Sequence, residues 1–537
     1  MPIISKTATV QELVALMREH GVTRCVVCPG SRNAPIAATL GAIEDFECRS
    51  VTDERSAGFM ALGWAAQTLA PVAVCVTSGS ALVNLHPAVA EAYYRHVPLL
   101  IISADRPAEW IGQQDGQTLP QPQVFGNLCR KSVTLPEKDE NGWYTNRLIN
   151  EALLELTHRE GGPVHINVPL EEPLFATEDA ELPRPRVIYR TELSSMNGDE
   201  EQTLLEIAAA LPRRMILLGQ MPIAMDLPPE LTEDHAFAIV GEHLCNTPNA
   251  DCTRPDTLLG GDAEYPLIPS PDLLITVGGC IVSKRLKKML RMNPPAEHWH
   301  LSRDGELCDT FCHLTRVIEG DPAELLDLLG AFAEEGDEAY RQLWCTAPAE
   351  FSAEHCGMSL VGDVLKNMPT PAVLHLANSS AVRYAQLFPL QDDVQVECNR
   401  GVNGIEGSLS TALGYAQADS RPQFIIIGDL SFFYDMNALW MGRVKANTRI
   451  LLLNNNGGGI FKTLPTPKIN LVEAPHTATA QAWAESCGLT YKAVVREEDW
   501  AEALELLCNG GDKAVIVEAF TDSEKDAEIL RNFYKEH

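Results

Sequence analysis

The chain has 537 residues, which at roughly 150 residues per domain predicts three or four domains. Hydrophobic residues make up 45% and charged residues 21%, a composition of globular proteins that excludes disordered, collagen-like and coiled-coil classes. The net charge of −31 repels nucleic-acid phosphates and anionic lipid headgroups, so we expect no nucleic-acid partner and no membrane partner. An anionic substrate would need a local group of arginines and lysines.

Apolar runs of strand length alternate with amphipathic helical patterns, which predicts an α/β fold built from βαβ units around parallel sheets. In the first third, apolar residues at helical spacing predict a helix over Thr9–His20. The predicted strands of this third are Arg24–Cys28, Val72–Thr77, Pro98–Ser103 and Val164–Val168.

A polar, aperiodic segment from Leu182 to Gln202 predicts a crossing between domains, and the Ala- and Glu-rich stretch Ala331–Gly357 predicts a helical connection. The middle strands are predicted at Met215–Gly219, Leu273–Val277 and His298–Leu301. Those of the last third are predicted at Ala372–Leu376, Gln423–Ile427, Arg449–Asn454 and Ala514–Glu518. We therefore expect three doubly wound parallel-sheet domains, at residues 1–182, 183–350 and 351–537.

The first ten residues lack the apolar stretch of a signal peptide, and no later run reaches the ~18 apolar residues of a membrane span. The 15 cysteines are scattered and odd in number, which is typical of reduced thiols rather than of a disulfide framework. Both observations predict a cytoplasmic protein.

The most informative stretch runs from Phe424 to Phe461. An apolar strand ends at Gly428-Asp429, a helical pattern follows, and a second apolar strand ends at Asn454-Asn455-Asn456-Gly457. Because parallel strands end at the same edge of a sheet, carboxylate, amide and carbonyl oxygens should meet there beside a helix start. Mg²⁺ prefers such oxygens, and the backbone N–H groups would bind phosphates, although a helix cap and a simple turn would leave the same signals.

The spacing favours the metal and phosphate site over a cap and a turn. Gly428-Asp429 and the asparagine pair that begins at Asn454 each follow an apolar strand directly, and Asn454 comes 25 residues after Asp429. This resembles the fingerprint of thiamine-diphosphate enzymes, with Leu430 where a glycine is usual. The resemblance implies thiamine diphosphate with Mg²⁺, or Mn²⁺, bound by Asp429, Asn455 and the carbonyl of Gly457. The other residues that it implies around the diphosphate are Gly428, Leu430, Ser431 and Gly458.

Glu54 follows a strand-like segment and opens the helical pattern Ser56–Gln67. A glutamate in a first turn can simply stabilise the helix dipole. Within the resemblance, Glu54 is instead the acid that protonates the aminopyrimidine of the cofactor. The resemblance also places Ser78 and Gly79 at the cofactor and makes Ile405 the apolar residue that bends it.

Four further segments of the N-terminal third follow the order found in one subfamily. They are Cys28-Pro29-Gly30-Ser31-Arg32, Asp53-Glu54-Arg55, Thr77-Ser78-Gly79-Ser80 and Ala104-Asp105-Arg106-Pro107. The C-terminal third adds Asn378 to Arg383, Asn399 to Gly407 and the run from Gly428 through Leu464-Pro465-Thr466-Pro467. The chain thereby resembles the MenD family, the 2-succinyl-5-enolpyruvyl-6-hydroxy-3-cyclohexene-1-carboxylate synthases of menaquinone biosynthesis.

The resemblance implies a transferase that decarboxylates 2-oxoglutarate and adds the succinyl-semialdehyde carbanion to isochorismate. Both substrates are dianions, and guanidinium groups can bind carboxylates through paired hydrogen bonds. The substrate-binding residues implied are Ser31, Arg32, Arg106, Gln117, Lys284, Arg285, Ser379, Arg383 and Arg400. Arg383 and Arg400 would hold one substrate, and Arg32, Arg106 and Lys284 the other.

Two alternatives stay open at this point: another thiamine-diphosphate 2-oxo-acid decarboxylase or acetohydroxyacid-synthase-like enzyme, and a non-catalytic binding protein on the same fold. Glu54 and Asp429 lie in different predicted domains. Enzymes of this type place those domains on different subunits around one cofactor, so the resemblance implies a homodimer or a dimer of dimers.

Overall fold

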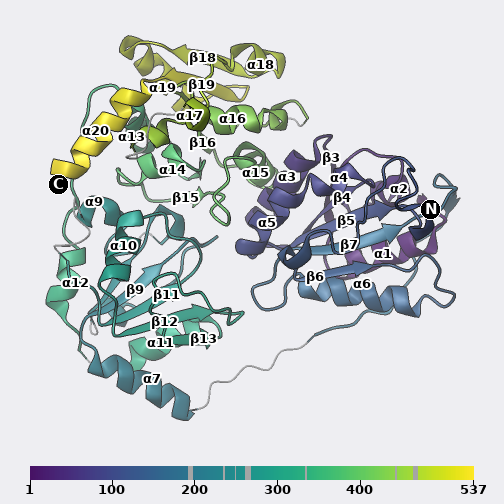
Figure 1. Ribbon diagram of the computed structural model, residues 1–537, viewed down its shortest axis with the longest axis horizontal. Helices are drawn as coiled ribbons and strands as arrows, with labels where there is room; N and C mark the ends of the chain where they lie inside the picture. Colours follow the sequence, from purple (N-terminus) through teal and green to yellow (C-terminus); the bar gives the residue numbers. More distant parts are fainter. Residues whose placement is uncertain are drawn as a thin grey trace. The chain divides into compact units, whose positions relative to one another are not determined.

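A computed structural model describes residues 1–190, 198–233, 236–247, 249–259, 268–332, 335–441, 444–463 and 470–536 (Figure 1). The predicted motif Leu464–Pro467 and residues 191–197 of the predicted crossing lie outside these ranges. Three larger sheets, of six, five and six strands, are entirely parallel. The α/β fold class predicted from the sequence is confirmed.

The first sheet has the strand order β3-β2-β4-β5-β7-β6. Its strands are β2 (Arg24–Val27), β3 (Glu47–Ser50), β4 (Val72–Val76), β5 (Leu99–Asp105), β6 (Lys131–Thr134) and β7 (Val164–Pro169). Its helices are α1 (Ala8–Glu19), α2 (Ala34–Ala42), α3 (Glu54–Thr68), α4 (Ser80–Val83), α5 (His86–Tyr94) and α6 (Trp143–Glu155). A short antiparallel pair, β1 (Ile3–Ser5) and β8 (Thr177–Asp179), lies beside it.

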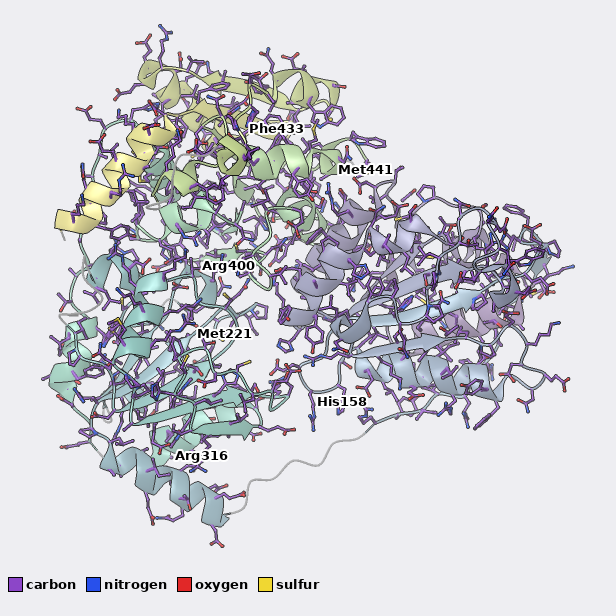
Figure 2. All side chains as sticks on the ribbon, viewed as in Figure 1. His158, Met221, Arg316, Arg400, Phe433 and Met441 are labelled. Atoms are coloured by element: carbon purple, nitrogen blue, oxygen red, sulfur yellow. The ribbon has the colours of Figure 1, made fainter. Side chains whose placement is uncertain are left out.

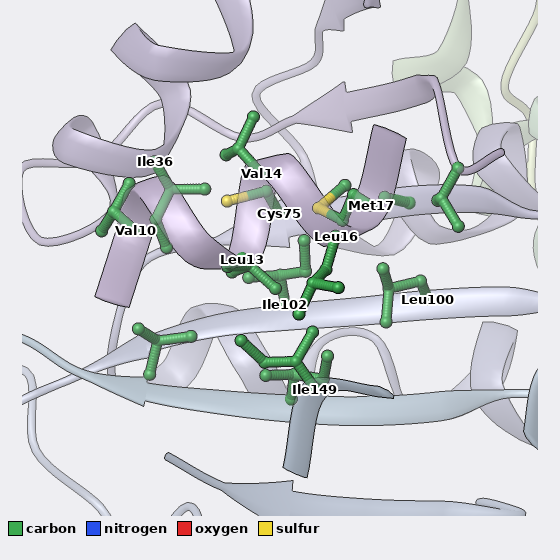
Figure 3. Close-up of a cluster of buried hydrophobic side chains, with 14 of the residues drawn as sticks. Val10, Leu13, Val14, Leu16, Met17, Ile36, Cys75, Leu100, Ile102 and Ile149 are labelled. Carbon is green, nitrogen blue, oxygen red and sulfur yellow. The ribbon is translucent and has the colours of Figure 1, made fainter. Parts of the chain in front are cut away.

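Helices α1, α2 and α6 cover one face of this sheet. Figure 3 shows Leu13 and Met17 of α1 packed with Cys75, Ile102 and other alternate strand residues, all of them inaccessible to solvent. Helix α3 contacts β2, β4 and β5, which lie in the middle of the sheet. Helices on both faces explain why the central strands are continuous apolar runs.

The second sheet has the order β10-β9-β11-β12-β13. Its strands are β9 (Arg214–Leu218), β10 (Phe237–Val240), β11 (Leu273–Val277), β12 (Glu297–Ser302) and β13 (Arg316–Glu319). Helices α7 (Gly198–Ala210), α8 (Glu230–Glu233) and α11 (Pro322–Phe332) pack on one face. Helices α9 (Pro255–Leu259), α10 (Lys284–Met292) and α12 (Glu338–Trp344) pack on the other.

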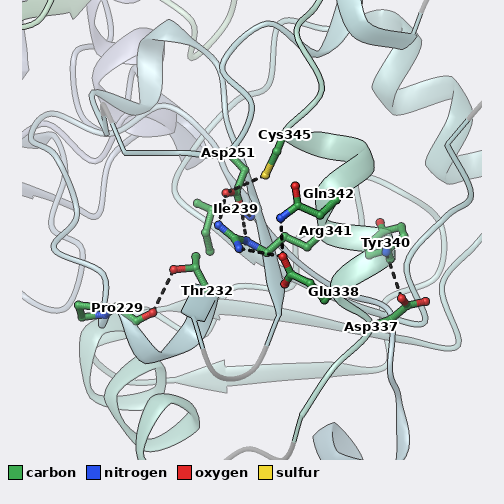
Figure 4. A network of polar contacts seen from close by, with 10 residues as sticks. All are labelled: Pro229, Thr232, Ile239, Asp251, Asp337, Glu338, Tyr340, Arg341, Gln342 and Cys345. Carbon is green, nitrogen blue, oxygen red and sulfur yellow. Dashed lines mark hydrogen bonds and ion pairs between the residues drawn. The ribbon is translucent and has the colours of Figure 1, made fainter.

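Helix α12 is also held to this sheet by charge. Figure 4 shows Arg341 in an ion pair with Asp251 at 2.9 Å, while the Asp251 carboxylate accepts the N–H of Ile239 in β10 at 2.8 Å. Among the described residues of the helical connection predicted over Ala331–Gly357, the end of α11, α12 and the first residue of α13 are helical, whereas residues 345–356 are not. The predicted crossing up to Gln202 is too long, because α7 already begins at Gly198.

The third sheet has the order β15-β14-β16-β17-β19-β18. Its strands are β14 (Ala372–Leu376), β15 (Val394–Glu397), β16 (Gln423–Gly428), β17 (Thr448–Asn454), β18 (Thr490–Val494) and β19 (Val515–Phe520). The helices of the last third of the chain are α13 (Gly357–Asn367), α14 (Ser380–Ala385), α15 (Ser408–Tyr415), α16 (Asp429–Tyr434), α17 (Asn470–Glu473), α18 (Gln481–Ser486), α19 (Trp500–Asn509) and α20 (Ser523–Glu536).

Short 3-10 helices occur along the described parts of the chain: η1 (Ala108–Trp110), η2 (Gly126–Leu128), η3 (His243–Cys245), η4 (Met436–Leu439), η5 (Gly459–Thr463) and η6 (Glu497–Asp499).

The chain forms two compact units, and each unit is made of three separate stretches of the sequence. The first comprises residues 1–192, 399–420 and 433–445, and the second comprises 193–398, 421–432 and 446–537. Within the first unit, α15 packs directly on α3. A Cβ added to Gly63 would lie 2.0 Å from the carbonyl oxygen of Thr411, and one added to Gly414 would lie 2.1 Å from that of Met60. Two glycines therefore permit the close packing of these helices.

Within the described ranges, no helix has both the length and the apolar character required to cross a membrane. All 15 cysteines are free thiols, of which Cys25, Cys28 and Cys75 are buried in the first sheet domain. Cys308, Cys312 and Cys345 are exposed, so the thiols do not all serve as buried apolar residues.

Candidate active site

Glu54 lies at the N-terminus of α3, in the first unit. The helix is capped by Asp53, whose Oδ1 accepts the N–H groups of Arg55 at 3.0 Å and Ser56 at 3.3 Å. The half-buried Glu54 side chain accepts a hydrogen bond from Asn84 Nδ2 at 3.4 Å. The cap fixes the helix start, and with it the backbone from which the predicted catalytic acid extends.

The Ser78-Gly79 turn follows β4 in the same unit. Gly79 adopts a φ of +85°, and its N–H donates to Gln121 Oε1 at 2.8 Å. Gln121 in turn donates to the carbonyl of Ala104 at 3.1 Å and to Asn167 Oδ1 at 2.8 Å. A fully buried glutamine that the sequence analysis did not identify therefore fixes this turn.

Two features of this turn suit it to a bound group. A Cβ on Gly79 would lie 3.0 Å from the Cα of Gln117, so the loop that contains Gln117 passes closely over the turn. The hydroxyl of Ser78 is buried, yet it has no hydrogen-bond partner among the residues that the structure describes. Because a buried polar atom normally has a partner, this hydroxyl suits contact with a bound ligand.

Arg32 and Arg106 lie in one electrostatic environment of the first unit. Arg32 is buried, donates to the carbonyl of Leu170 at 2.9 Å and lies 3.5 Å from Glu172. Arg106 forms an ion pair with Asp115 at 2.9 Å. Burial lowers the pKa of Arg32, and the positive charge of Arg106 lowers it further, so the two guanidinium groups interact electrostatically.

Three other predicted residues belong to the first unit. Ser31 is exposed in the turn before Arg32. Arg400 and Ile405 lie in the loop after β15, where Arg400 is buried and Ile405 is exposed. This loop leads into α15, the helix that packs on α3.

Asp429 lies in the second unit, where β16 ends and α16 begins. Its Oδ1 accepts the N–H of Leu430 at 2.6 Å, and its Oδ2 accepts those of Asn455 at 3.1 Å and Gly457 at 3.0 Å. His476 Nε2 lies 3.2 Å from the same Oδ2. Burial raises the pKa of Asp429, whereas the N–H groups and His476 act to lower it. The predicted βαβ arrangement is confirmed, since β16 and β17 are parallel neighbours.

The loop after β17 has the donor set for a hard cation. Asn455 Oδ1 is buried and has no hydrogen-bond partner in the described part of the chain. Gly457 has a φ of +149°, and a Cβ there would lie 2.7 Å from the carbonyl oxygen of Glu473. Gly458 donates its N–H to that same carbonyl at 2.6 Å. A carboxylate, an unpartnered amide oxygen and a glycine loop fit Mg²⁺ or Mn²⁺.

Within the described ranges, no group of three or more His, Cys, Asp or Glu side chains could hold a metal ion. Next to Asp429, Gly428 ends β16 with open space beside its Cα, and Ser431 is buried in α16. The sequence analysis missed His476, which lies 47 residues after Asp429 in a segment without a recognisable motif.

Lys284 and Arg285 form the N-terminus of α10, also in the second unit. Ser283 caps this helix by accepting the N–H of Leu286 at 2.9 Å, and its hydroxyl donates to Asp256. The guanidinium of Arg285 lies 3.9 Å from the centre of the Tyr534 ring, in α20. Asp256 and Tyr534 were not predicted, because only the tertiary fold brings them to Arg285.

Arg383 and Ser379 lie at the start of α14. Ser379 has a φ of +75°, rare for a residue other than glycine, and its carbonyl accepts a hydrogen bond from Arg383 Nη1 at 2.7 Å. Burial raises the pKa of Asp256, and the charges of Arg285 and Arg383 both lower it. The half-buried carboxylate of Asp256 is therefore influenced by both arginines.

Comparisons with known proteins agree with this division into two half-sites. The family model of the N-terminal thiamine pyrophosphate binding domain of thiamine pyrophosphate enzymes matches residues 8–124, and that of their C-terminal binding domain matches residues 379–519. The chain also resembles benzoylformate decarboxylase from Polynucleobacter necessarius, at a TM-score of 0.72 and 16% identity over 95% of this chain and 98% of that one. At this identity the likeness supports the fold alone.

Curated relatives are far more similar in sequence. The 2-succinyl-5-enolpyruvyl-6-hydroxy-3-cyclohexene-1-carboxylate synthase of Phocaeicola vulgatus is 49% identical over 99% of this chain and 98% of its own length. The synthase of Bacteroides fragilis is 48% identical over 99% of both chains, and that of Flavobacterium johnsoniae 35% over 99% of this chain and 100% of its own. The chain therefore belongs to the MenD family, the thiamine-diphosphate-dependent synthases that form this carbon–carbon bond in menaquinone biosynthesis.

Proposed function

We propose that this chain decarboxylates 2-oxoglutarate and adds the remaining four-carbon unit to isochorismate, giving 2-succinyl-5-enolpyruvyl-6-hydroxy-3-cyclohexene-1-carboxylate. The observation that carries the proposal is the similarity to synthases of this name over 99% of the chain, which contains the residues proposed for both ends of the cofactor. Glu54 begins α3, and Asp429 lies in hydrogen-bonding contact with the Asn455-Gly457 loop. A binding protein without activity would need no such combination.

In the proposed mechanism, Glu54 would donate its proton to the pyrimidine ring of the bound cofactor and would take it back in each cycle. Thiamine diphosphate, when bound, supplies the electron sink that stabilises the carbanion left by decarboxylation. Its diphosphate would contact the backbone around Gly428–Ser431 and Gly458. Asp429, Asn455 and the Gly457 carbonyl would hold Mg²⁺ or Mn²⁺, which neutralises the charge of that diphosphate. Ser78 and Gly79 would contact the cofactor, and Ile405 would support its bent conformation.

The arginines would hold the substrate carboxylates. We assign Arg383 and Arg400 to one dianion and Arg32, Arg106 and Lys284 to the other. Arg285, Ser31, Gln117 and Ser379 would complete these contacts. Arg106 lies near enough to Arg32 in the first unit to lower its pKa, and Arg285 and Arg383 both act on Asp256 in the second, so each unit would offer arginines to a substrate carboxylate in an acidic chain.

Assembly and location extend the same proposal. Glu54 belongs to one compact unit and Asp429 to the other. We propose a homodimer, alone or paired into a tetramer, in which each site takes Glu54 from one copy and Asp429 from the other. We place the protein in the cytoplasm.

Substrate assays test the proposal directly. With thiamine diphosphate and Mg²⁺ present, isochorismate should be consumed when 2-oxoglutarate is added and not when pyruvate replaces it. Decarboxylation of pyruvate without consumption of isochorismate would instead support a different 2-oxo-acid decarboxylase. No reaction with either oxo acid, despite cofactor binding, would support the non-catalytic alternative.

The variant Glu54→Gln tests the proposed acid. Turnover should fall by about 100-fold or more, because general acid–base catalysis typically contributes ~10² to 10⁴. Folding should be unchanged, since Asp53 and not Glu54 caps the helix. Glu44→Gln, an exposed position in the same domain, is the matched control and should retain full turnover. Near-normal activity of Glu54→Gln would refute the mechanism.

A further inference from the structure

Helix α5 contacts the loop that contains Arg400 through a buried acidic side chain. Glu91 of α5 is 1% exposed. Its Oε1 accepts the N–H of Gly401 at 2.9 Å, and its Oε2 accepts the N–H of Val402 at 2.9 Å. Both partners directly follow Arg400, which is labelled in Figure 2, and all of these residues belong to the first unit. The contacts therefore hold the backbone on the C-terminal side of Arg400.

The same helix holds the other side of Arg400. Arg95 lies one turn after Glu91, and its Nη1 donates to Asn399 Oδ1 at 3.4 Å. The amide of Asn399 donates to Thr411 Oγ1 in α15 at 3.0 Å. The backbone of Arg400 is thus fixed from both of its neighbours by side chains that lie far away in the sequence.

The loop approaches α5 so closely that only glycine fits beside Glu91. A Cβ on Gly401 would lie 2.9 Å from the backbone oxygen of Glu91 and 3.0 Å from its Oε2. Gly401 therefore allows both N–H groups to reach the carboxylate. The close approach is independent evidence that the loop has one defined position relative to α5.

A carboxylate suits this position better than an amide would. It offers two acceptor oxygens at once, whereas glutamine would turn an NH₂ donor toward one of the two N–H donors. Burial raises the pKa of Glu91, and Arg95, the two N–H groups and Arg400 act to lower it. The nearby guanidinium groups and the N–H donors offset the cost of burying this charge.

We propose that Glu91 is a positioning residue for Arg400: it touches no substrate, and it sets the place from which the Arg400 guanidinium meets a substrate carboxylate. The proposal rests on the function proposed above, in which Arg400 binds one of the two dianions. A small displacement of the loop would weaken that contact while leaving Glu54 and the metal loop intact.

The test compares Glu91→Gln, Arg400→Ala and the double variant, each in the holoenzyme with thiamine diphosphate and Mg²⁺. In Glu91→Gln we expect the KM of one substrate to rise about 10-fold while kcat changes by less than about threefold. The affinity for Mn²⁺, measured by electron paramagnetic resonance, should not change. In the Arg400→Ala background, Glu91→Gln should raise KM by less than about twofold, because a residue that acts through Arg400 has nothing left to position.

Glu44→Gln is the control for loss of a carboxylate and should match the wild type. If Glu91→Gln raises KM equally with and without Arg400, or leaves KM unchanged, the proposal is wrong. If Glu91→Gln does not fold, Arg95→Met removes the contact to Asn399 and should raise the same KM by a smaller factor; no change in KM would then overturn the proposal. A wild-type protein that does not consume isochorismate would refute the proposed function instead, so the two failures are distinguishable.

Discussion

Two buried carboxylates show how the same local structure serves different purposes in the two units. Glu91 in the first unit and Asp429 in the second both accept backbone N–H groups from a glycine-containing loop. Burial raises the pKa of both, and the N–H groups lower it again. In their hydrogen bonds to the backbone, the Glu91 and Asp429 carboxylates are nearly equivalent.

Their surroundings separate them. Glu91 lies near the permanent cations Arg95 and Arg400. Asp429 lies near His476, which is charged only when protonated, and its loop carries the unpartnered Oδ1 of Asn455. The fold itself places two permanent cations near Glu91. Asp429 lies beside a titratable histidine instead and is suited to bind a cation from solution. Charge around a carboxylate, rather than its hydrogen bonds, therefore indicates a metal site.

The comparison of Glu91 with Asp429 predicts that the largest effect of a substitution is the loss of metal binding at Asp429. Asp429→Asn should weaken Mn²⁺ binding about 100-fold or more, because it removes the only negative charge among the proposed ligands. Isothermal titration with thiamine diphosphate present would measure this loss. Asp392→Asn, at an exposed position of the same unit, should bind the metal normally. Equal Mn²⁺ affinity in Asp429→Asn and the wild type would remove the distinction between the two carboxylates.

A second prediction concerns the helix contact beside the Arg400 loop. Gly63→Ala should lower the free energy of unfolding by about 1–3 kcal/mol, since the new Cβ would lie 2.0 Å from the Thr411 carbonyl. Urea unfolding would measure the change. Gly41→Ala, in α2 with no atom within 4 Å of a Cβ, should instead stabilise by about 0.5–1 kcal/mol. Equal stability of both variants would mean that α3 and α15 are not closely packed.

A third prediction concerns another carboxylate, Asp435, which has no metal role. It accepts the N–H of Ser410 at 2.6 Å and its hydroxyl at 2.7 Å, and burial raises its pKa to about 6. Between the unfolded value of 3.8 and about 6, the folded state binds more protons, so this group makes stability fall as pH rises. The loss should be roughly 1–3 kcal/mol.

Thermal unfolding of Asp435→Asn between pH 4 and 7 would measure this contribution. The variant cannot ionise, so its profile should lack the decline that the wild type shows up to about pH 6. Parallel profiles of the two proteins would assign the pH dependence to other groups.

The sequence predicted the interior of each sheet and missed its edges. All eleven predicted strands are interior strands of the three larger sheets. The unpredicted strands are the edge strands β3, β6, β10, β13, β15 and β18 of these sheets, together with the short pair β1 and β8. Interior parallel strands are covered on both faces and are therefore apolar throughout, whereas Glu47–Ser50 of β3 is exposed at three of four residues. A short or polar strand leaves no such signal.

The site shows the same limit. Asp429 and Asn455 lie at strand ends with a recognisable spacing, so the sequence reveals them. Gln121, His476, Asp256 and Glu91 act through tertiary contacts, and nothing next to them in the sequence marks their roles. The residues that we predict to touch a ligand follow motifs, while the residues that contact them were found only from the fold.

The central claim is that Glu54 and Asp429 serve one site completed by two copies of the chain. Glu54→Gln and Asp429→Asn should each be inactive alone. After their subunits are mixed and exchanged, half of the dimers should be mixed, each with one intact site, which restores about a quarter of the wild-type activity. Native mass spectrometry would confirm the mixed dimers. Mixed dimers as inactive as the parent variants would contradict the claim, because both residues would then have to come from the same chain.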